Sequence, residues 1–366
     1  MAGTATPANA LRDACDIRLG FPHDDAGSPG DWLRDVAAYL DTQKVDDEIF
    51  MSGKLARNLE DHCAELLGKQ AAVWFPTGTM AQLAAALIHA AAKGKRTIGL
   101  HPTSHLLLHE EDAIRALAGL EPVTVGEWAR IIEPSDVEAA ADLAALFIEL
   151  PHRHTGGQCP DWDTLSATIS AARQKGAATH LDGARLWSVR KAMGGRSYAE
   201  ICAPFDTVYV SFYKDVGALG GAILAGSEDL MAQAKTWRHR QGGLQVRSWP
   251  VMADVLRRLP AAIESMPDCI SAAGEIAGLF YNAGFEIEPF PVQTNIFHVR
   301  VPFSEDDFIS HRDAIAAETR VWLGGAGWAL DGRAGRSLEV TVSSRLASAD
   351  RNRLDSAIRM LAGRRG

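Results

Sequence analysis

Seven short apolar runs, each bounded by turn residues, constrain the fold of this chain most strongly. They are "AAVWFP" (71–76), "RTIGLH" (96–101), "PVTVG" (122–126), "LAALFIEL" (143–150), "ATHLDGAR" (178–185), "TVYVSFYK" (207–214) and "GAILAG" (221–226). Most of them are separated by amphipathic or alanine-rich stretches that are long enough for a helix, such as 80–93 and 162–175. Strands that alternate with helices in this way predict an α/β fold, with a mostly parallel sheet covered on both faces.

The last two runs depart from this pattern. Only six residues separate Lys214 from Gly221, which is too few for a crossover helix, so the final pair of strands is predicted to be antiparallel. Beyond residue 226, helix-like segments lead to runs at 294–301, 320–324 and 337–343 that alternate polar and apolar residues. This texture predicts a smaller α+β domain. We therefore expect an N-terminal arm (1–44), a large domain (45–249) and a C-terminal domain (250–366).

Composition narrows the class of partner. The 366 residues carry a formal net charge of -9 and contain no block of lysine and arginine, which disfavours nucleic acid. No apolar stretch is long enough to suggest a membrane span, and the N-terminus lacks the pattern of a signal peptide. The five cysteines are scattered and form no CxxC pair, so neither a disulfide framework nor a zinc cluster is indicated. We expect a cytoplasmic protein with no membrane and no nucleic-acid partner.

Two charged residues follow predicted strands at the edge where α/β sheets bind ligands. Asp182 comes after "ATHL", and Lys214 ends "TVYVSFY" 32 residues later, so both side chains are expected in one crevice. A desolvated lysine can lose its proton and form a Schiff base with an aldehyde, and a carboxylate suits a protonated pyridine nitrogen. The alternative is a surface lysine at a strand end and an aspartate that caps a helix.

A third segment suggests a phosphate site. In "FPTGTMAQL" (75–83) a strand ends at Pro76, and Gly78 and Thr79 open an alanine-rich helix whose free N–H groups can hold an anion. Taken alone, this pattern favours a plain helix cap. No Walker loop and no GxGxxG occurs, which disfavours nucleotide enzymes.

Taken in order, "PTGTMAQ", "HLDGARLW" and "SFYKDVGALGGAILAG" resemble the low-specificity threonine aldolases, within the β-eliminating lyase group of fold-type-I pyridoxal phosphate enzymes. The family pattern is PTGTxAN, then DGAR, then SKGLGxPxGS. The resemblance extends over residues 45–245 and is weaker outside them. It implies a fold-type-I large domain, pyridoxal 5'-phosphate as cofactor, an amino acid as substrate, and assembly into a homodimer or homotetramer.

The resemblance also implies roles for individual residues. Lys214 is matched to the lysine that bonds the cofactor, Asp182 to the partner of the pyridine nitrogen, and Gly78 and Thr79 to the phosphate. His105 matches the histidine that stacks on the ring, and Glu110 matches the acid after it. Arg238 matches an arginine near the phosphate that reaches it across a dimer interface. Arg185 in DGAR is expected near the substrate carboxylate. His152, in "LPHRH" where the family has ENTHN, is the candidate catalytic base.

The reaction implied is cleavage of a β-hydroxy-α-amino acid, such as threonine or a phenylserine-like substrate, to glycine and an aldehyde. Three departures leave β-elimination, transaldolation or racemisation as alternatives. Leu19 replaces the serine of the N-terminal RSDT pattern, Phe50 stands at the substrate site where a tyrosine is expected, and the family's C-terminal arginine that binds the carboxylate has no unambiguous match among Arg336, Ser337 and Arg345. Asp215 also follows Lys214, where it can raise the pKa of the lysine unless it points away.

Histidines offer a competing interpretation. His101, His105 and His109 are spaced by four, as three zinc ligands on one helix face would be, and this pattern is compatible with a metal-dependent hydrolase. Pro102 argues against a helix that runs through all three. We therefore expect no metal site and assign His105 alone to the cofactor.

Overall fold

A computed structural model describes residues 7–20, 28–44, 48–329 and 335–365. Its contacts divide the chain into two compact units. Unit 1 comprises Met1–Asp25, Thr155–Gln158 and Glu264–Gly366, and unit 2 comprises Ala26–His154 and Cys159–Ile263. The expected boundary at 249/250 lies at the start of helix α11 (Trp249–Asn282), whereas the division between the two units lies within this helix, between Ile263 and Glu264. The boundary expected at 44/45 borders residues 45–47, which lie outside the described residues.

Unit 2 is built on a seven-stranded sheet in the order β2-β8-β7-β6-β5-β3-β4. The strands are β2 (Ala71–Phe75), β3 (Thr97–Leu100), β4 (Glu121–Thr124), β5 (Ala145–Glu149), β6 (Ala178–Gly183), β7 (Thr207–Ser211) and β8 (Ala222–Gly226). Each lies within or beside one of the predicted runs, so the predicted seven-stranded, mostly parallel sheet is confirmed. The antiparallel pairing of β7 with β8 is confirmed too, and β8 is also antiparallel to β2.

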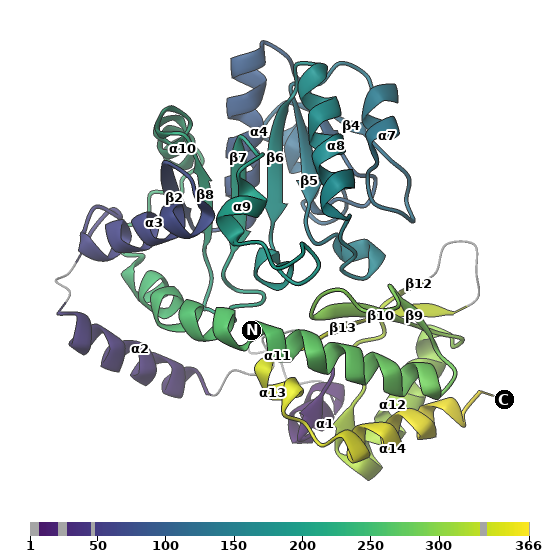
Figure 1. The fold of residues 1–366 in the computed structure, drawn as a ribbon. Helices are drawn as coiled ribbons and strands as arrows, with labels where there is room; N and C mark the ends of the chain where they lie inside the picture. Colours follow the sequence, from purple (N-terminus) through teal and green to yellow (C-terminus); the bar gives the residue numbers. More distant parts are fainter. Residues whose placement is uncertain (1–6, 21–27, 45–47, 330–334, 366) are drawn as a thin grey trace. The chain divides into compact units, whose positions relative to one another are not determined.

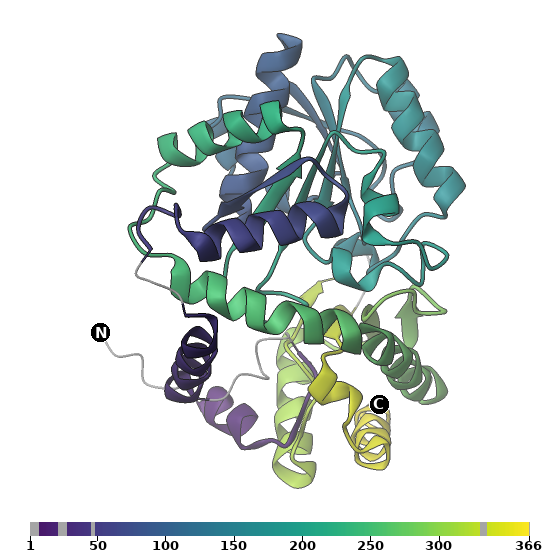
Figure 2. The ribbon, with the colours of Figure 1, turned by 60° about the vertical axis from the view of Figure 1, so that its left-hand side comes forward.

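Helices cover both faces of this sheet (Figures 1 and 2). On one face, α4 (Gly78–Lys93) packs against β5 to β8, and α10 (Glu228–Arg240) packs against α4. On the other face, α3 (Lys54–Leu67) packs against β2 and β8, and α8 (Trp162–Gln174) packs against β6. The short helices α9 (Tyr198–Cys202) and α7 (Pro134–Ala139) pack beside α3 and α8, respectively. The other described helices of the unit are α2 (Pro29–Gln43), α5 (His105–Leu108), α6 (Ala113–Ala116), η3 (Leu186–Ser188) and the first part of α11, while η2 (Arg153–Thr155) ends at the first residue of a unit 1 segment.

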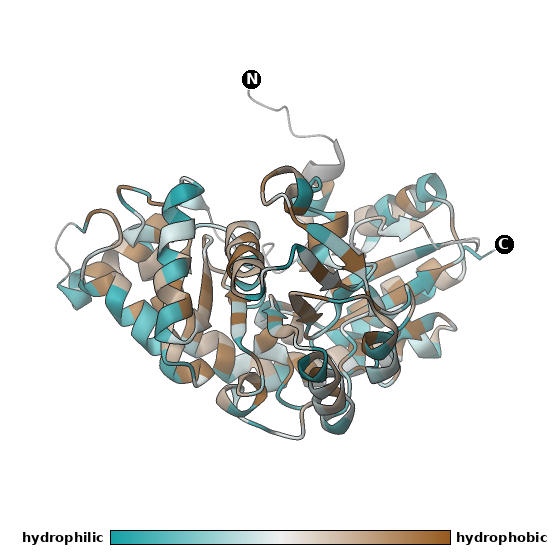
Figure 3. Ribbon diagram, turned by 90° about the horizontal axis from the view of Figure 1, so that it is seen from above, coloured by the Kyte–Doolittle hydropathy of each residue, from teal (hydrophilic) through white to brown (hydrophobic). Residues whose placement is uncertain are grey.

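The sequence of α4 explains its central place. Seven of its sixteen residues are alanine, the strongest helix former, and their small side chains let the helix lie close to the sheet. Thr77 caps the first turn by accepting a hydrogen bond from the Met80 N–H, and Gly94 ends the helix in the left-handed region at φ 63°. Hydropathy colouring shows apolar residues along the strands and mixed faces on the surrounding helices (Figure 3).

Unit 1 contains a four-stranded antiparallel sheet in the order β12-β13-β10-β9. Its strands are β9 (Glu286–Glu288), β10 (Ile296–Val301), β12 (Trp328–Ala329) and β13 (Arg336–Thr341). A second, parallel pair joins β1 (Ile17–Arg18) to β11 (Val321–Trp322). The helices are α1 (Pro7–Ala14), α12 (Glu305–Thr319), α13 (Ser344–Ala347), α14 (Arg351–Ala362) and the last part of α11. Among the described helices of both units, none combines the length and the apolar character that crossing a membrane requires.

Candidate active site

Lys214 lies in the loop between β7 and β8, three residues beyond Ser211, where β7 ends. The predicted strand was therefore too long, because the chain leaves the sheet although Phe212 is still fully buried. The return turn is tight: Gly221 has φ 87°, and a Cβ there would lie 1.7 Å from the Trp74 ring. Burial, together with the nearby Arg185 guanidinium, lowers the pKa of Lys214 to about 8. An amine with this pKa is partly neutral at neutral pH and is suited to nucleophilic attack.

Asp182 is the fifth residue of β6 and is buried. Its register partners are Glu149 on β5 and Tyr209 on β7, so these three side chains share one face of the sheet. Burial is the main cause that raises the pKa of Asp182 to about 6, and the Glu149 carboxylate adds to it, whereas Lys214 opposes the increase. The Asp182 carboxylate accepts hydrogen bonds from the Gln82 side-chain amide and from the Ala184 N–H, the latter at 3.1 Å.

The amino end of α4 lies at the same edge of the sheet. A helix leaves its first N–H groups without intrahelical partners, and in α4 these belong to Gly78 and Thr79. A Cβ at Gly78 would come 2.0 Å from the hydroxyl oxygen of Tyr209, so only glycine fits between this turn and the tyrosine. The position combines free donors with the positive end of a 16-residue helix, which suits a phosphate.

His105 begins α5, and its side chain is one-third exposed. Its Nδ1 atom lies 2.9 Å from Oε1 of Glu110, a carboxylate that is almost fully buried. This contact orients the imidazole ring. The charge of His105 also acts on Asp182 and lowers its pKa, so the two side chains are near each other.

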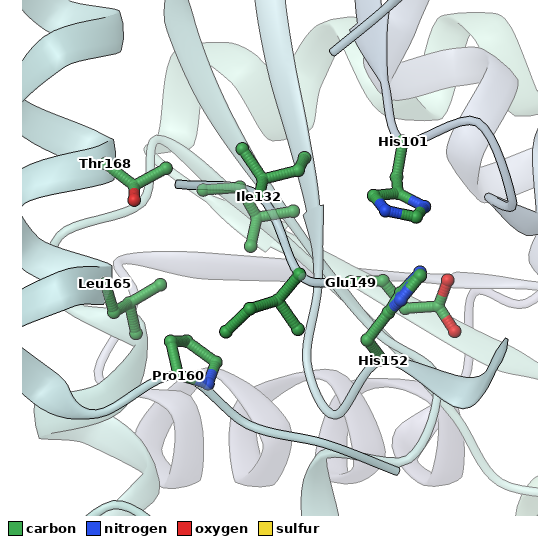
Figure 4. A pocket seen from close by; sticks show the side chains of 9 residues that line it. His101, Ile132, Glu149, His152, Pro160, Leu165 and Thr168 are labelled. Atoms are coloured by element: carbon green, nitrogen blue, oxygen red, sulfur yellow. The ribbon is translucent and has the colours of Figure 1, made fainter. Parts of the chain in front are cut away.

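His152 follows β5 and is buried against His101, with the two ring centroids 4.1 Å apart in an edge-on arrangement. Thr103 lies between them, with its hydroxyl 2.8 Å from His101 Nδ1 and 3.1 Å from His152 Nε2. Burial lowers the pKa of His152 to about 4. Figure 4 shows both rings and Glu149 on one side of a small cavity, of about 20 Å³, whose opposite wall is mainly apolar. The imidazole of His152 is therefore neutral at neutral pH and can accept a proton.

Three further residues that the sequence assigned to the site, Arg185, Arg238 and Phe50, lie in different surroundings. Arg185 is buried just beyond β6 and acts on Lys214. Arg238 is buried in α10, where its Nη1 donates to the Trp74 carbonyl at 2.7 Å and lies 3.7 Å from Glu60. Phe50 is 47% exposed and its N–H donates to the Val246 carbonyl at 2.9 Å, so the described contacts do not tie it to Lys214 or Asp182.

Asp215 is not among the main causes that shift the pKa of the lysine beside it. Its charge raises the pKa of Tyr198 on α9, whereas the causes that shift the pKa of Lys214 are burial, Arg185, Asp182, Glu149 and Arg153.

The three histidines spaced by four do not share a helix. His101 directly follows β3, while α5 starts only at His105. Within residues 7–20, 28–44, 48–329 and 335–365, no group of three histidine, cysteine, aspartate or glutamate side chains is arranged to hold a metal ion. The chain folds so that His109 and His154 meet instead, with 3.1 Å between their Nε2 atoms.

Several polar residues at this site do not follow from the motifs alone. Gln82 contacts Asp182, and behind Gln82 lie His180, Thr207 and His89, all buried. Sequence periodicity contains a partial signal. Gln82 is four residues after Gly78 on one helix, and His180 is two residues before Asp182 on one strand, so each pair shares a face.

The carboxyl ends of five strands therefore meet at one edge. Residues that follow β2, β3, β5, β6 and β7 are, in turn, Gly78, His105, His152, Arg185 and Lys214, with Asp182 at the end of β6 itself. Ligands of open α/β sheets bind at this edge. The set offers an amine of lowered pKa, a buried carboxylate and a helix amino end, which complement an aldehyde, a pyridine nitrogen and a phosphate.

Comparisons with known proteins agree with this chemistry. A low-specificity L-threonine aldolase of Arabidopsis thaliana is 28% identical over 280 residues, which cover 73% of this chain and 77% of the plant protein. An alanine racemase of Cochliobolus carbonum is 30% identical over 225 residues, which cover 58% of this chain and 55% of the fungal protein. A crystal structure from Listeria monocytogenes, provisionally named an L-allo-threonine aldolase, is 31% identical with a TM-score of 0.89, and covers 97% of this chain and 99% of that chain.

The similarity in structure confirms the predicted fold-type-I architecture. The profile of the family described as "Beta-eliminating lyase" matches residues 35–301, which include the whole seven-stranded sheet and every residue of the predicted site. On this match, the chain belongs to the β-eliminating lyase family.

Proposed function

We propose that this protein is a pyridoxal phosphate-dependent aldolase that cleaves a β-hydroxy-α-amino acid, such as threonine or a phenylserine-like substrate, to glycine and an aldehyde. The observation that carries the proposal is that Lys214, whose pKa is lowered to about 8, and the buried carboxylate of Asp182 each act on the pKa of the other. The aldolase names of the Arabidopsis and Listeria relatives support the choice of reaction.

Four parts of the site would hold the cofactor. Lys214 supplies the amine for its aldehyde, Asp182 faces its ring nitrogen, and the N–H groups of Gly78 and Thr79 face its phosphate. His105, oriented by Glu110, stacks on the ring. Arg238 donates to the carbonyl of Trp74, four residues before Gly78, and its buried Nε has no hydrogen-bond partner among the described side chains and backbone groups. Bound here, the cofactor supplies an electron sink for the electrons of the broken bond.

The protein's own residues divide the remaining work. Arg185 binds the substrate carboxylate through its planar guanidinium. His152, neutral because it is buried, accepts the proton of the β-hydroxyl group as the Cα–Cβ bond breaks, directly or through one water molecule. Asp182 keeps the ring nitrogen protonated. We also propose that the enzyme is cytoplasmic. We further propose that it acts as a homodimer or homotetramer, and light scattering on the purified protein tests this oligomeric state.

The decisive experiment has two parts. Borohydride reduction of the protein incubated with pyridoxal phosphate should attach the cofactor to the peptide that contains Lys214, as seen by mass spectrometry, and Lys214→Ala should abolish the label. Assays with threonine and phenylserine should then release glycine and an aldehyde. Release of ammonia and a keto acid would instead establish β-elimination.

A second candidate is racemisation, which the alanine racemase relative favours. It uses the same cofactor and the same Lys214, so loss of activity in Lys214→Ala does not separate it from aldol cleavage. Formation of D-alanine from L-alanine, followed by chiral chromatography, separates the two.

His152→Ala should lower aldol cleavage by about 10²–10⁴-fold while the cofactor stays bound.

A further inference from the structure

A row of buried polar side chains runs from Asp182 into the layer between α4 and the sheet. Its members are Gln82, His180, Thr207 and His89, which are at most 3% exposed. His180 Nε2 lies 2.8 Å from Gln82 Oε1, His180 Nδ1 lies 2.8 Å from Thr207 Oγ1, and His89 Nε2 lies 2.7 Å from the same hydroxyl oxygen. The Gln82 amide donates to Asp182. We call these four residues the relay.

The fold places the relay residues on facing surfaces. Gln82 and His89 are seven residues apart on α4, which is two helical turns, so both project toward the sheet. His180 and Asp182 are two residues apart on β6 and share its inner face. Thr207 is the register partner of His180 on β7. One face of α4 and the facing side of β6 and β7 therefore bring these residues into a continuous hydrogen-bonded row.

Every hydrogen bond of the relay has a defined direction. An ionised carboxylate only accepts, so the amide of Gln82 must present its NH₂ group to Asp182 and its oxygen to His180. His180 Nε2–H then donates to that oxygen, and its Nδ1 accepts from the Thr207 hydroxyl. Thr207 Oγ1 in turn accepts from His89 Nε2–H. In each of these hydrogen bonds, the donor is the group that lies farther along the row from Asp182.

The relay acts through dipoles and not through charge. Burial lowers the pKa of His89 to about 4 and that of His180 well below its ordinary value, so both rings are neutral at neutral pH. Near His89 lie Asp206, whose charge raises the pKa of the histidine, and Lys93, whose charge lowers it. Aligned donors in a low-dielectric interior strengthen one another and stabilise the carboxylate that terminates the row.

That stabilisation of the carboxylate opposes the effects of burial and of Glu149 on Asp182. Burial and Glu149 favour its protonated form, whereas Lys214, His105 and the Ala184 N–H favour the carboxylate. Tyr209 faces it from β7. We infer that Gln82, His180, Thr207 and His89 are positioning residues that hold Asp182 ionised and aimed at the ring nitrogen of the cofactor. This inference rests on the proposed function.

Thr207 gives the sharpest test, because three hydrogen bonds and two intervening side chains separate it from Asp182. Thr207→Val has nearly the same shape but can neither donate to His180 nor accept from His89. Thr179→Val is the matched control: Thr179 is a fully buried threonine on β6 whose hydroxyl binds Asp206 at 3.1 Å, outside the relay. Thr207→Ser keeps the hydroxyl and should restore the parent's behaviour.

The first readout is the ring nitrogen of bound ¹⁵N-labelled pyridoxal phosphate, followed by NMR as the pH is varied. Thr207→Val should lower the pH midpoint of ring-nitrogen protonation by about one unit, a tenfold change, while Thr179→Val leaves it unchanged. Turnover should fall by about tenfold with KM nearly constant. If Thr207→Val and Thr179→Val lose stability equally and their ring-nitrogen midpoints match the parent's, the relay is only structural and the inference is overturned.

The second readout needs no cofactor. In the ¹⁵N-histidine-labelled protein, His89 and His180 should both be the neutral Nε2–H tautomer from pH 6 to pH 9, and an Nδ1–H tautomer at either ring overturns the direction of the relay. The two proposals fail separately. A protein that binds no pyridoxal phosphate contradicts the proposed function, whereas an active enzyme with an unchanged ring nitrogen in Thr207→Val contradicts only the relay.

Discussion

Glu149 and Asp182 are register partners at the carboxyl ends of β5 and β6, so two carboxylates lie side by side on one face of the sheet. Their repulsion adds to burial in raising the pKa of Asp182. Oε2 of Glu149 is buried without a hydrogen-bond partner among the described residues, while Oε1 accepts from the Arg153 N–H at 3.1 Å. Glu149 thus opposes the ionisation of Asp182, the residue that we assign to the ring nitrogen.

Glu149→Gln should therefore lower the pKa of Asp182. Glutamine keeps an acceptor for the Arg153 N–H and removes only the charge. The measurement is a pH titration of the aspartate side-chain carbonyl by ¹³C NMR, on protein without cofactor. Glu138→Gln, at an exposed glutamate on α7, serves as the control and should leave the midpoint in place. An Asp182 midpoint that stays the same in Glu149→Gln contradicts the assignment.

Asp182→Asn should stabilise the protein without cofactor at alkaline pH. The folded-state pKa of Asp182, about 6, lies above the ordinary value of 3.8, so its contribution to stability is full below pH 3.8 and is lost as the pH rises through 6. Two pKa units correspond to about 3 kcal/mol at most. Urea unfolding should show this gain at pH 8 and none at pH 3.5. A variant that is less stable than the parent at pH 8 would contradict the expected cost of the buried carboxylate.

Much of the large unit's architecture is readable from the sequence, because strands buried on both faces leave continuous apolar runs. The same property explains the errors at strand ends. Leu150 and Phe212 are fully buried yet lie beyond the last paired residue of β5 and β7, so hydrophobicity does not distinguish a strand from the buried chain that follows it. The short strands β9 and β12 carry too few apolar residues to be recognised.

The site is predictable only where a motif marks it. Lys214 and Gly78 follow strands that the sequence reveals, Asp182 lies near the end of another, and the sheet brings the three to one edge. The contacts of Gln82 and the pairing of Glu149 with Asp182 depend on how α4 docks and on the register between strands. These are relationships between residues far apart in the chain, and no local pattern specifies them.

Buried neutral histidines should make the protein sensitive to acid. The pKa values of His89, His101 and His152 are each lowered from 6.5 to about 4, chiefly by burial. Between these values the unfolded chain binds protons that the folded chain does not, so stability is full above pH 6.5 and falls as the pH drops toward 4. At pH 5 each histidine should cost roughly 2 kcal/mol. Urea unfolding at pH 7.5 and pH 5 measures the loss.

His89→Gln isolates one of these contributions. The glutamine amide can replace the Nε2–H donor to Thr207 but does not titrate, so the variant should lose less stability than the parent between pH 7.5 and pH 5. His62→Gln, at an exposed histidine of α3, should behave like the parent. Equal losses in the parent and in His89→Gln would show that His89 does not resist protonation.

Gly78→Ala should weaken cofactor binding, because a Cβ at this position would lie 2.0 Å from Tyr209 Oη and 2.7 Å from its Cζ. Either the tyrosine or the first turn of α4 must move, and both border the N–H groups assigned to the phosphate. We expect the Kd for pyridoxal phosphate to rise at least about tenfold, which corresponds to about 1.4 kcal/mol. Absorbance titration measures it. Gly220→Ala is the matched control in the Lys214 loop, since its Cβ would meet nothing closer than Val251 Cγ1 at 3.8 Å. Tyr209→Leu in the Gly78→Ala background should recover affinity if the clash is the cause, and equal weakening by Gly220→Ala would place the effect in general loop disturbance instead.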